Sequence, residues 1–206
     1  MATTDTILVL DFDGVIGLSH PGGPKPWSAD LARDWKLDPA VLNAEFFGGP
    51  FVDVVRGRLD LYAALDPWLA SQGIVGRTLE FASWWFERDS VFDTALLDAV
   101  RAWRARTGGR CYVATNQEHH RIGYLRGLPA LEGLFDEFVY SAALGVAKPE
   151  RVFFTNAQQR IVVSTGRRIA YFDDAAANVD AARACGWRAW LYRERRQVEA
   201  FLDADG

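Results

Sequence analysis

The chain has 206 residues, of which 50% are hydrophobic and 24% are charged, and its formal net charge at neutral pH is −4. This is ordinary globular composition, and a mildly acidic chain is not attracted to nucleic acid or to an anionic membrane by its overall charge. The two separated cysteines, Cys111 and Cys185, are expected to be small buried hydrophobic side chains and indicate neither a disulfide framework nor a zinc site. No stretch approaches the apolar length of a membrane span, so we expect a cytoplasmic protein without nucleic-acid or membrane partners.

The first predicted element is a buried strand over residues 7–10, an unbroken apolar run that ends in Asp11-Phe12-Asp13-Gly14. A fully apolar run of this length is typical of a parallel strand covered on both faces. Asp11 and Asp13 are two residues apart, so on a strand their side chains point to the same side. Gly14 allows the backbone to turn sharply afterwards. Two carboxylates placed in this way can serve as a nucleophile and as a general acid or base.

The next seventy residues contain no convincing buried strand. Helical patterns cover residues 28–35, 39–46, 59–69 and 78–86. We therefore predict an all-helical insertion over residues 19–89, set into an α/β core formed by residues 1–18 and 90–206. Eight large aromatic side chains crowd this insertion, and we expect most of them to form its own core; they are Trp27, Trp35, Phe46, Phe47, Trp68, Trp84, Trp85 and Phe86.

After the insertion, helical and strand patterns alternate to the end of the chain. Strands are predicted over residues 111–115, 137–140, 169–172 and 188–192, and helices over residues 94–106, 118–125, 150–164, 175–184 and 193–202. Such alternation indicates a parallel sheet with right-handed crossovers. The predicted fold class is therefore α/β, a doubly wound parallel-sheet (Rossmann-like) core with an all-helical insertion.

Polar residues follow three of the predicted strands at the point where each strand ends. Thr115 ends one strand and is followed by Asn116, and Asp173 and Asp174 follow another. Because ligands of open parallel sheets bind at the carboxyl ends of the strands, we expect these residues to converge with the first two aspartates. Four carboxylates at one edge need compensating charge. Since no His or Cys cluster is available, a Mg²⁺ ion with oxygen ligands is the simplest source of that charge.

Two further features of this edge predict a phosphate site. Thr115 supplies a hydroxyl donor, and the backbone amide of Asn116, near a helix start, can hold phosphate oxygens. Lys148 lies just before a predicted helix whose first turn contains Pro149. A lysine at that place can neutralise a phosphoryl group during its transfer.

Taken together, these motifs resemble those of the haloacid dehalogenase-like hydrolase superfamily. The matching residues, in the family's order, are Asp11-Phe12-Asp13-Gly14-Val15, Thr115-Asn116, Lys148-Pro149, and Asp173-Asp174 with Asn178. The four motifs together are far more specific than the first alone, and the resemblance spans nearly the whole chain. It implies that the helical insertion is the small helical cap of this family.

The resemblance also implies a role for each motif residue. Asp11 would attack phosphorus and form an aspartyl-phosphate, while Asp13 would protonate the leaving group and then activate water. The implied Mg²⁺ site comprises Asp11, the backbone carbonyl of Asp13, and Asp174 as a direct ligand, with Asp173 either binding the ion or ordering its water. Thr115, the amide of Asn116 and Lys148 would hold the phosphate.

The second aspartate also separates the chemistries of the family. Members that cleave carbon–halogen bonds resemble one another in lacking an aspartate two residues after the nucleophile, because a halide leaves without a proton. The presence of Asp13 therefore favours hydrolysis of a small phosphorylated metabolite. A phosphomutase or phosphotransferase remains an alternative, as do, with less support, a haloacid dehalogenase and a non-catalytic phosphometabolite sensor. Asn178 either supports the site or faces solvent, and both a monomer and a homodimer remain open.

Overall fold

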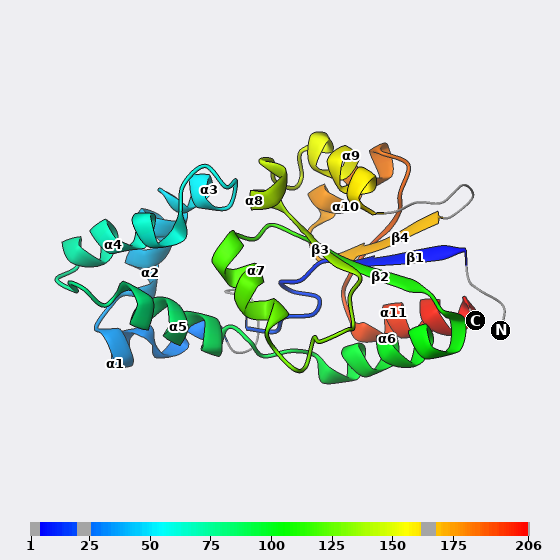
Figure 1. The fold of residues 1–206 in the computed structure, drawn as a ribbon, viewed down its shortest axis with the longest axis horizontal. Coiled ribbons are helices and arrows are strands. Elements are labelled where there is room, and N and C mark those ends of the chain that lie inside the picture. Colours follow the sequence, from blue (N-terminus) through cyan, green and yellow to red (C-terminus); the bar gives the residue numbers. More distant parts are fainter. Residues whose placement is uncertain (1–4, 20–25, 162–167, 206) are drawn as a thin grey trace.

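A computed structural model describes residues 5–19, 26–161 and 168–205 of the chain (Figure 1). Its centre is a five-stranded sheet in the order β3-β2-β1-β4-β5, and every pairing between neighbouring strands is parallel. The strands are β1 (Thr6–Leu10), β2 (Arg110–Thr115), β3 (Glu137–Tyr140), β4 (Arg168–Asp173) and β5 (Arg188–Leu191). The prediction of a Rossmann-like parallel core is confirmed, and each predicted strand is present.

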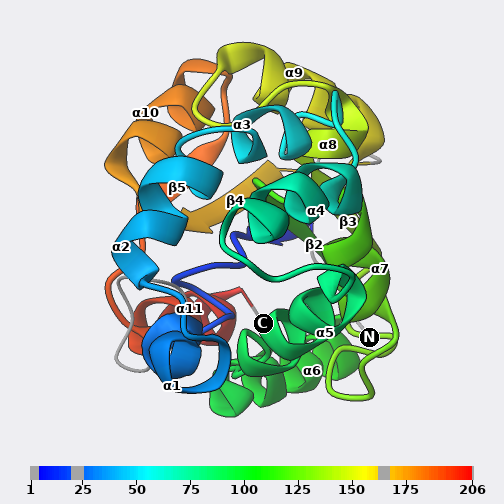
Figure 2. The same ribbon diagram turned by 90° about the vertical axis from the view of Figure 1, so that its left-hand side faces the viewer.

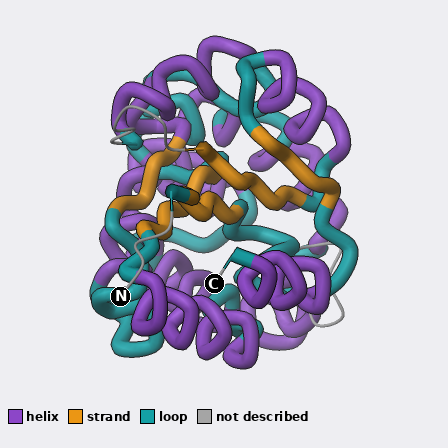
Figure 3. Tube along the Cα trace, turned by 90° about the vertical axis from the view of Figure 1, so that its right-hand side faces the viewer, coloured by secondary structure: helices purple, strands orange, loops and turns teal. Residues whose placement is uncertain are grey.

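Helices cover both faces of this sheet. On one face lie α6 (Thr94–Thr107) and α11 (Arg195–Ala204), and on the other lie α9 (Arg151–Arg160) and α10 (Ala176–Ala184) (Figure 1). Side chains of a strand alternate between faces, so Leu8 and Leu10 pack with α6 and α11, whereas Ile7 and Val9 pack with α9 and α10. Figure 3, which looks onto the end with the termini, shows the strands between the two helical layers. This double cover explains why β1 is an unbroken apolar run.

Residues 27–88 form a separate group of helices beyond the carboxyl ends of the strands, which we call the helical insertion (Figures 1 and 2). It consists of η1 (Trp27–Asp30), α1 (Leu31–Trp35), α2 (Pro39–Val41), η2 (Leu42–Phe47), α3 (Phe51–Val54), α4 (Leu61–Ser71) and α5 (Thr78–Arg88). The insertion has its own hydrophobic cluster, to which all eight predicted aromatic residues contribute. Burying these large rings gives a small helical unit a core of its own.

Several elements differ from the sequence-based expectations. The helices predicted over residues 28–35 and 39–46 each divide in two, since a 3₁₀ turn precedes α1 and a π-helix follows α2. Two four-residue helices, α3 and α8 (Ser141–Leu144), are too short to show a periodic pattern and were not predicted. The helix predicted over residues 150–164 ends at Arg160, where the β-branched run begins; residues 162–167 lie outside the described part of the chain. Cys185, expected to be buried, is partly exposed.

The remaining helix, α7 (His119–Arg126), lies between the sheet and the helical insertion (Figure 1). Glu118 caps its first turn, as its carboxylate accepts hydrogen bonds from the backbone amides of His120 and Arg121. Among the described residues, no helix combines the length and the apolar character that crossing a bilayer requires.

Candidate active site

The site begins at the junction of β1 and β4. The chain passes from β1 to β2 and β3 on one side and then crosses to β4 on the other side, which creates a switch point where ligands of such sheets bind. Asp11 follows β1 directly, and its backbone amide donates to the carbonyl of Phe172 in β4 at 2.9 Å. Asp173 is the last residue of β4. The sheet register therefore places Asp11 and Asp173 next to each other.

Lys148 lies between these two carboxylates and is almost fully buried. Its Nζ is 2.7 Å from Asp11 Oδ1 and 2.8 Å from Asp173 Oδ2, and it also donates to the carbonyl of Ala114 (3.0 Å) and the hydroxyl of Tyr171 (3.1 Å). Burial alone would lower the pKa of Lys148, but Asp11 and Asp173 outweigh it and raise that pKa. The two carboxylates therefore favour the charged form of this buried ammonium, and burial strengthens its interaction with them.

Asn116 holds the backbone of this lysine in place. Its Nδ2 donates to the carbonyl of Lys148 at 2.9 Å, and the amide of Lys148 donates to Asn116 Oδ1 at 2.7 Å. This pair ties the loop after β2 to the loop before α9. Thr115, the residue before Asn116, is buried at the end of β2. The sequence predicted the amide of Asn116 as a phosphate ligand but did not predict this positioning of the lysine by the side chain.

The carboxylate of Asp173 is surrounded by donors. It accepts from Asn178 Nδ2 at 3.0 Å to both oxygens, from the amide of Ala175 at 2.8 Å, and from the hydroxyl of Tyr171. Burial raises the pKa of Asp173, but Lys148, the hydroxyl of Tyr171 and the amide of Ala175 outweigh burial and hold that pKa below its usual value. Asn178, for which two roles were open, is thus turned into the site. These hydrogen bonds fix the orientation of the Asp173 carboxylate.

Asp11 is buried close to one ammonium, that of Lys148, and to two further carboxyls, those of Asp13 and Asp173. Its Oδ1 accepts from Lys148 and from the amide of Phe12 at 2.7 Å. Burial nevertheless raises the pKa of Asp11 well above its usual value; Lys148 opposes this shift, while Asp173 and Asp13 add to it. Further positive charge close to Asp11 would oppose this shift and stabilise its carboxylate.

Three carboxylates of the site could supply that charge by binding a cation. Asp11, Asp173 and Asp174 each place an oxygen so that these atoms lie within 4.8 Å of one another. An all-oxygen donor set with excess negative charge fits a hard divalent ion such as Mg²⁺. Among the described residues, the side chain of Asp13 does not belong to this group, and the contribution predicted for Asp13 is through its backbone carbonyl.

The turn after β1 lies directly against this group. Gly14 has a φ of +81°, which favours glycine, and a Cβ atom at this position would collide with the carboxylate of Asp174. A larger residue at position 14 would therefore push the turn away from Asp174. The glycine of the first motif is thus explained by close approach as well as by backbone conformation.

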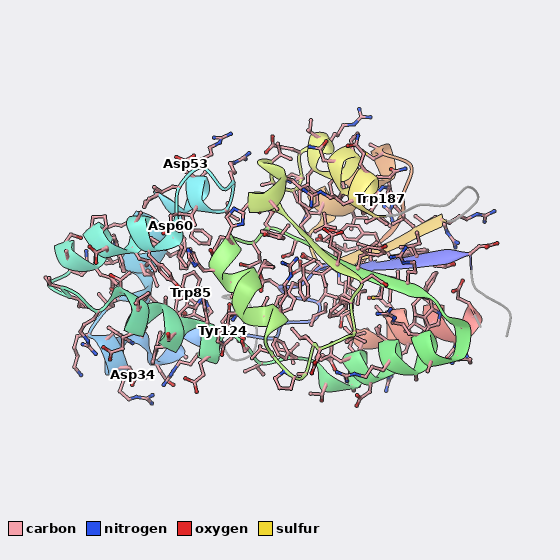
Figure 4. All side chains as sticks on the ribbon, viewed as in Figure 1. Asp34, Asp53, Asp60, Trp85, Tyr124 and Trp187 are labelled. Carbon is pink, nitrogen blue, oxygen red and sulfur yellow. The ribbon has the colours of Figure 1, made fainter. Side chains whose placement is uncertain are left out.

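Asp13 faces a cavity between the sheet and the helical insertion. Its Oδ2 accepts a hydrogen bond from Gln117 Nε2 at 2.9 Å. The cavity has a volume of about 320 Å³ and is lined by Asp13, Trp27, Asn43, Phe47, Phe51, Trp85, Asp89, Asn116 and Gln117. Figure 4 labels Trp85, which lies among the side chains of the insertion. A larger groove of about 630 Å³, lined by residues that include Asp34, Arg77 and Trp84, contains none of the strand-end residues.

The insertion contacts the sheet domain through a few polar pairs. Asp60, at the start of α4, lies 2.6 Å from Nε2 of His120 on α7, and the ring of Tyr62 packs against the same histidine at 4.0 Å. Arg56 pairs with Glu150 at 2.5 Å.

A buried arginine holds the segment that returns from the insertion to the sheet. Arg121 of α7 donates to the carbonyl of Phe86 at 2.7 Å, to Ser90 Oγ at 3.0 Å and to the carbonyl of Asp89. The carboxylate of Asp89 lies 3.4 Å from the same guanidinium and accepts from Ser19 Oγ at 3.3 Å. Burial raises the pKa of Asp89 to about 7, although Arg121 opposes the shift. Both connections to the insertion are thereby joined to α7.

Three residues of the site were not predicted from the sequence. Gln117 directly follows the second motif, which is a signal that could have been used. Tyr171 lies inside an apolar strand pattern, and Asp89 directly follows α5, the last helix of the insertion. Nothing local distinguishes Tyr171 from a core tyrosine or Asp89 from a helix end, because their roles depend on Lys148 and Arg121 from distant parts of the chain.

Comparison with known proteins identifies a family and a set of similar folds. A family model described as haloacid dehalogenase-like hydrolase matches residues 6–186. No curated protein matches the sequence. A HAD family enzyme from Bacteroides thetaiotaomicron is similar in structure, with a TM-score of 0.74 at 14% identity over 94% of this chain and 95% of that chain.

One further similar structure contains magnesium and inorganic phosphate, and another is a haloacid dehalogenase. The same Bacteroides thetaiotaomicron enzyme in complex with magnesium and inorganic phosphate gives a TM-score of 0.70 at 15% identity, covering 91% of this chain and 94% of that chain. The L-2-haloacid dehalogenase from Xanthobacter autotrophicus gives 0.61 at 15% identity, covering 91% of this chain and 76% of that chain. At these identities the likeness shows the fold.

Proposed function

Since the chain belongs to the haloacid dehalogenase-like hydrolase family, we propose that it is a Mg²⁺-dependent phosphatase acting on small phosphate monoesters. The similar structures include both a magnesium–phosphate complex and a haloacid dehalogenase, so likeness alone does not choose the chemistry. The observation that carries the proposal is the position of Asp13. Its carboxyl lines the cavity and is held by Gln117, where it can give a proton to a departing alkoxide.

In the proposed reaction Asp11 is the nucleophile. Its carboxylate oxygen forms a bond to phosphorus while the bond from phosphorus to the leaving oxygen breaks, and Asp13 transfers its proton to that oxygen. The ionised Asp13 then takes a proton from water, whose oxygen attacks the aspartyl-phosphate. Inorganic phosphate leaves, Asp11 is regenerated, and Asp13 is again protonated.

The other motif residues would hold the charges of this reaction. Lys148 already contacts Asp11, so its ammonium would face the transferring phosphoryl group, with Thr115 and the amide of Asn116 as further donors. The carboxylates of Asp11, Asp173 and Asp174, with the carbonyl of Asp13, would hold Mg²⁺. When bound, this ion would offset the negative charge of the phosphate and of the site.

The helical insertion would serve as the cap of the enzyme. We assign residues 19–89 to it, with residues 1–18 and 90–206 as the catalytic core. Its aromatic side chains form one wall of the cavity that contains Asp13, so closing it on the core would exclude water from the reacting groups.

The test is release of inorganic phosphate from a panel of small phosphomonoesters, measured with Mg²⁺ and with a chelator. We expect release by the native protein to need Mg²⁺ and to fall by at least about 10³-fold in Asp11→Asn, which removes the nucleophile. In Asp13→Asn we expect a loss of about 10²- to 10⁴-fold for alkyl esters and a smaller loss for esters of acidic phenols, which leave without a proton.

Two results would contradict the proposal. Halide release from a haloacid, undiminished in Asp13→Asn and without any phosphatase activity, would show that the nucleophile serves dehalogenation. Isomerisation of a sugar phosphate without phosphate release would show a phosphomutase. Circular dichroism of each variant serves as the control for folding.

A further inference from the structure

The cavity beside Asp13 also limits which leaving group the site can accept. This inference rests on the proposed function, in which Asp13 gives its proton to the leaving oxygen. A general acid must lie within hydrogen-bond reach of that oxygen. Because Asp13 lines the cavity, the remainder of the alcohol must extend into the same cavity. The walls of this space therefore contact the part of the substrate that distinguishes one phosphate ester from another.

Four aromatic rings of the helical insertion form the greater part of those walls. Trp27 and Trp85 are stacked, with ring centroids 5.1 Å apart and an interplanar angle of 29°. Phe47 meets the edge of Trp85 at 5.4 Å and 80°, and Phe51 lies 6.0 Å from Trp85. The rings come from η1, η2, α3 and α5, so the packing of the whole insertion fixes this surface. Such walls favour an apolar or aromatic group.

The polar part of the lining carries no positive charge in the described chain. Besides the rings, the cavity is lined by the carboxyls of Asp13 and Asp89 and by the amide side chains of Asn43, Asn116 and Gln117. Neither Lys nor Arg is among these described lining residues. A second anionic group on the leaving alcohol would therefore lie near two carboxyls without an ion-pair partner.

Nearby cations are engaged elsewhere. Arg121 lies behind Asp89 with 1% of its side chain exposed, and its guanidinium donates to Phe86 O, Ser90 Oγ and Asp89 O. Lys148 contacts Asp11 and so faces the phosphoryl end of the site. Among the described residues around the cavity, these contacts leave no cation directed at the leaving group.

We propose that this site accepts phosphate monoesters of compact apolar or aromatic alcohols and discriminates against leaving groups that carry a second anionic charge. A cavity of about 320 Å³ suits a leaving group of about one substituted ring. Sugar bisphosphates, nucleoside polyphosphates and phosphorylated carboxylic acids are disfavoured substrates under this proposal, because each brings an additional negative charge into the aromatic pocket.

A matched pair of substrates tests the charge rule with the native protein. Phenyl phosphate and 4-carboxyphenyl phosphate share one ring and differ by one carboxylate. The carboxylate makes the phenol a slightly better leaving group, so intrinsic reactivity favours the anionic ester. We expect kcat/KM in the presence of Mg²⁺ to be at least about tenfold higher for phenyl phosphate, because its ring brings no unpaired charge into the pocket. Glycerol 2-phosphate, neutral but polar in its leaving group, should also be poorer than phenyl phosphate.

A charge introduced in the pocket gives a second measurement. Asn43 is an exposed residue of η2 that lines the cavity and has no proposed part in the chemistry. Asn43→Lys should raise kcat/KM for 4-carboxyphenyl phosphate relative to phenyl phosphate by at least about threefold. The matched control Asn43→Asp should change this ratio in the opposite direction. Neither variant should alter the far-UV circular dichroism spectrum.

The outcomes separate this inference from the proposed function. If phosphate is released from 4-carboxyphenyl phosphate or a bisphosphate as efficiently as from phenyl phosphate, the inference is wrong although the phosphatase assignment stands. If neither Asn43 variant changes the ratio of kcat/KM for 4-carboxyphenyl phosphate to that for phenyl phosphate, the inference is likewise wrong. If no ester in any panel releases phosphate in a manner dependent on Asp11, the proposed function fails and this inference with it.

Discussion

The strand-end cluster, which consists of Asp11, Lys148, Asp173 and Asp174, lies next to the cavity under the helical insertion. The two regions differ in how they are built. The cluster consists of charges in a dry site, and each ordered group has several partners, as Lys148 contacts two carboxylates, a carbonyl and a hydroxyl. The cavity is walled mainly by aromatic rings. The first arrangement comes from adjacent strand ends of one sheet, whereas the second comes from the packing of several helices against one another.

This difference predicts which substitutions affect the stability of the protein and which affect its choice of substrate. Removing one charge from the cluster leaves its partners buried and unpaired, which costs both stability and chemistry. Changing the cavity wall alters contacts to the leaving group but leaves the charges of the cluster in place. We therefore expect substitutions in the cluster to act on both folding and turnover, and those in the insertion to act mainly on substrate choice.

The largest effect is expected for Lys148→Met. Methionine retains much of the aliphatic volume but leaves Asp11 and Asp173 without their ammonium. Loss of one partner of a buried ion pair destabilises by about 3–5 kcal/mol. Chemical denaturation should show this decrease in the free energy of unfolding, together with a loss of turnover of at least about 10²-fold.

If Lys148→Met is as stable as the native protein, the contrast drawn between the strand-end cluster and the cavity is wrong. Such a result would mean that the cluster does not depend on the lysine for its charge balance. Phe51→Leu, in the cavity wall, is the matched control: it should keep most of the native stability and change KM more than kcat.

A divalent cation should stabilise the cluster to an extent that depends on pH. Because the folded-state pKa of Asp11 is raised, the folded chain holds this proton more tightly than the unfolded chain does. In the absence of metal, the stability contributed by Asp11 is present below its ordinary pKa and is lost as pH rises toward the raised value. Cation binding requires the ionised carboxylate, so the stabilisation by Mg²⁺ should grow over the same interval.

Thermal unfolding with Mg²⁺ and with a chelator, at pH 5 and pH 8, measures this effect. At a Mg²⁺ concentration of one hundred times Kd the gain is about 2.7 kcal/mol. We expect a larger shift in the melting temperature at the higher pH, and a much smaller one in Asp174→Asn, which removes one oxygen ligand of the group. If Mg²⁺ raised the melting temperature of the native protein and of Asp174→Asn equally, the cation would bind elsewhere.

The same contrast decides how much could be predicted from the sequence. The strand-end residues could be located because a buried parallel strand is an apolar run and its polar ending is visible locally, as at Asp11 and Asp173. The ring arrangement around Trp85 could not be predicted, since it depends on how η1, η2, α3 and α5 pack. Likewise, the amide of Asn116 was predicted as a phosphate ligand from its motif, but the bonds of its side chain to Lys148 join residues that are 32 positions apart in the chain.

The smallest effect is expected where the insertion meets α7. Asp60 has two functions there: its carboxylate accepts from the amides of Tyr62 and Ala63 at the start of α4, and it pairs with His120. Asn is as good a helix cap as Asp, so Asp60→Asn keeps the first function and removes the charge of the pair. Asp60→Ala removes both, and it should be less stable than Asp60→Asn by about 1 kcal/mol, the usual contribution of a cap.

The pair itself should contribute less than the cap, because it is largely exposed and a surface ion pair is worth about 0–1 kcal/mol. The hydrogen bond from His120 lowers the pKa of Asp60, so the stability contributed by this carboxylate is present above its ordinary pKa and is lost as pH falls through the lowered value. Chemical denaturation of Asp60→Asn and Asp60→Ala at neutral pH separates the contribution of the helix N-cap from that of the pair with His120. If Asp60→Asn lost as much stability as Asp60→Ala, the contact with His120 would be the dominant function, and the junction would be a stronger link between insertion and core than its exposure suggests.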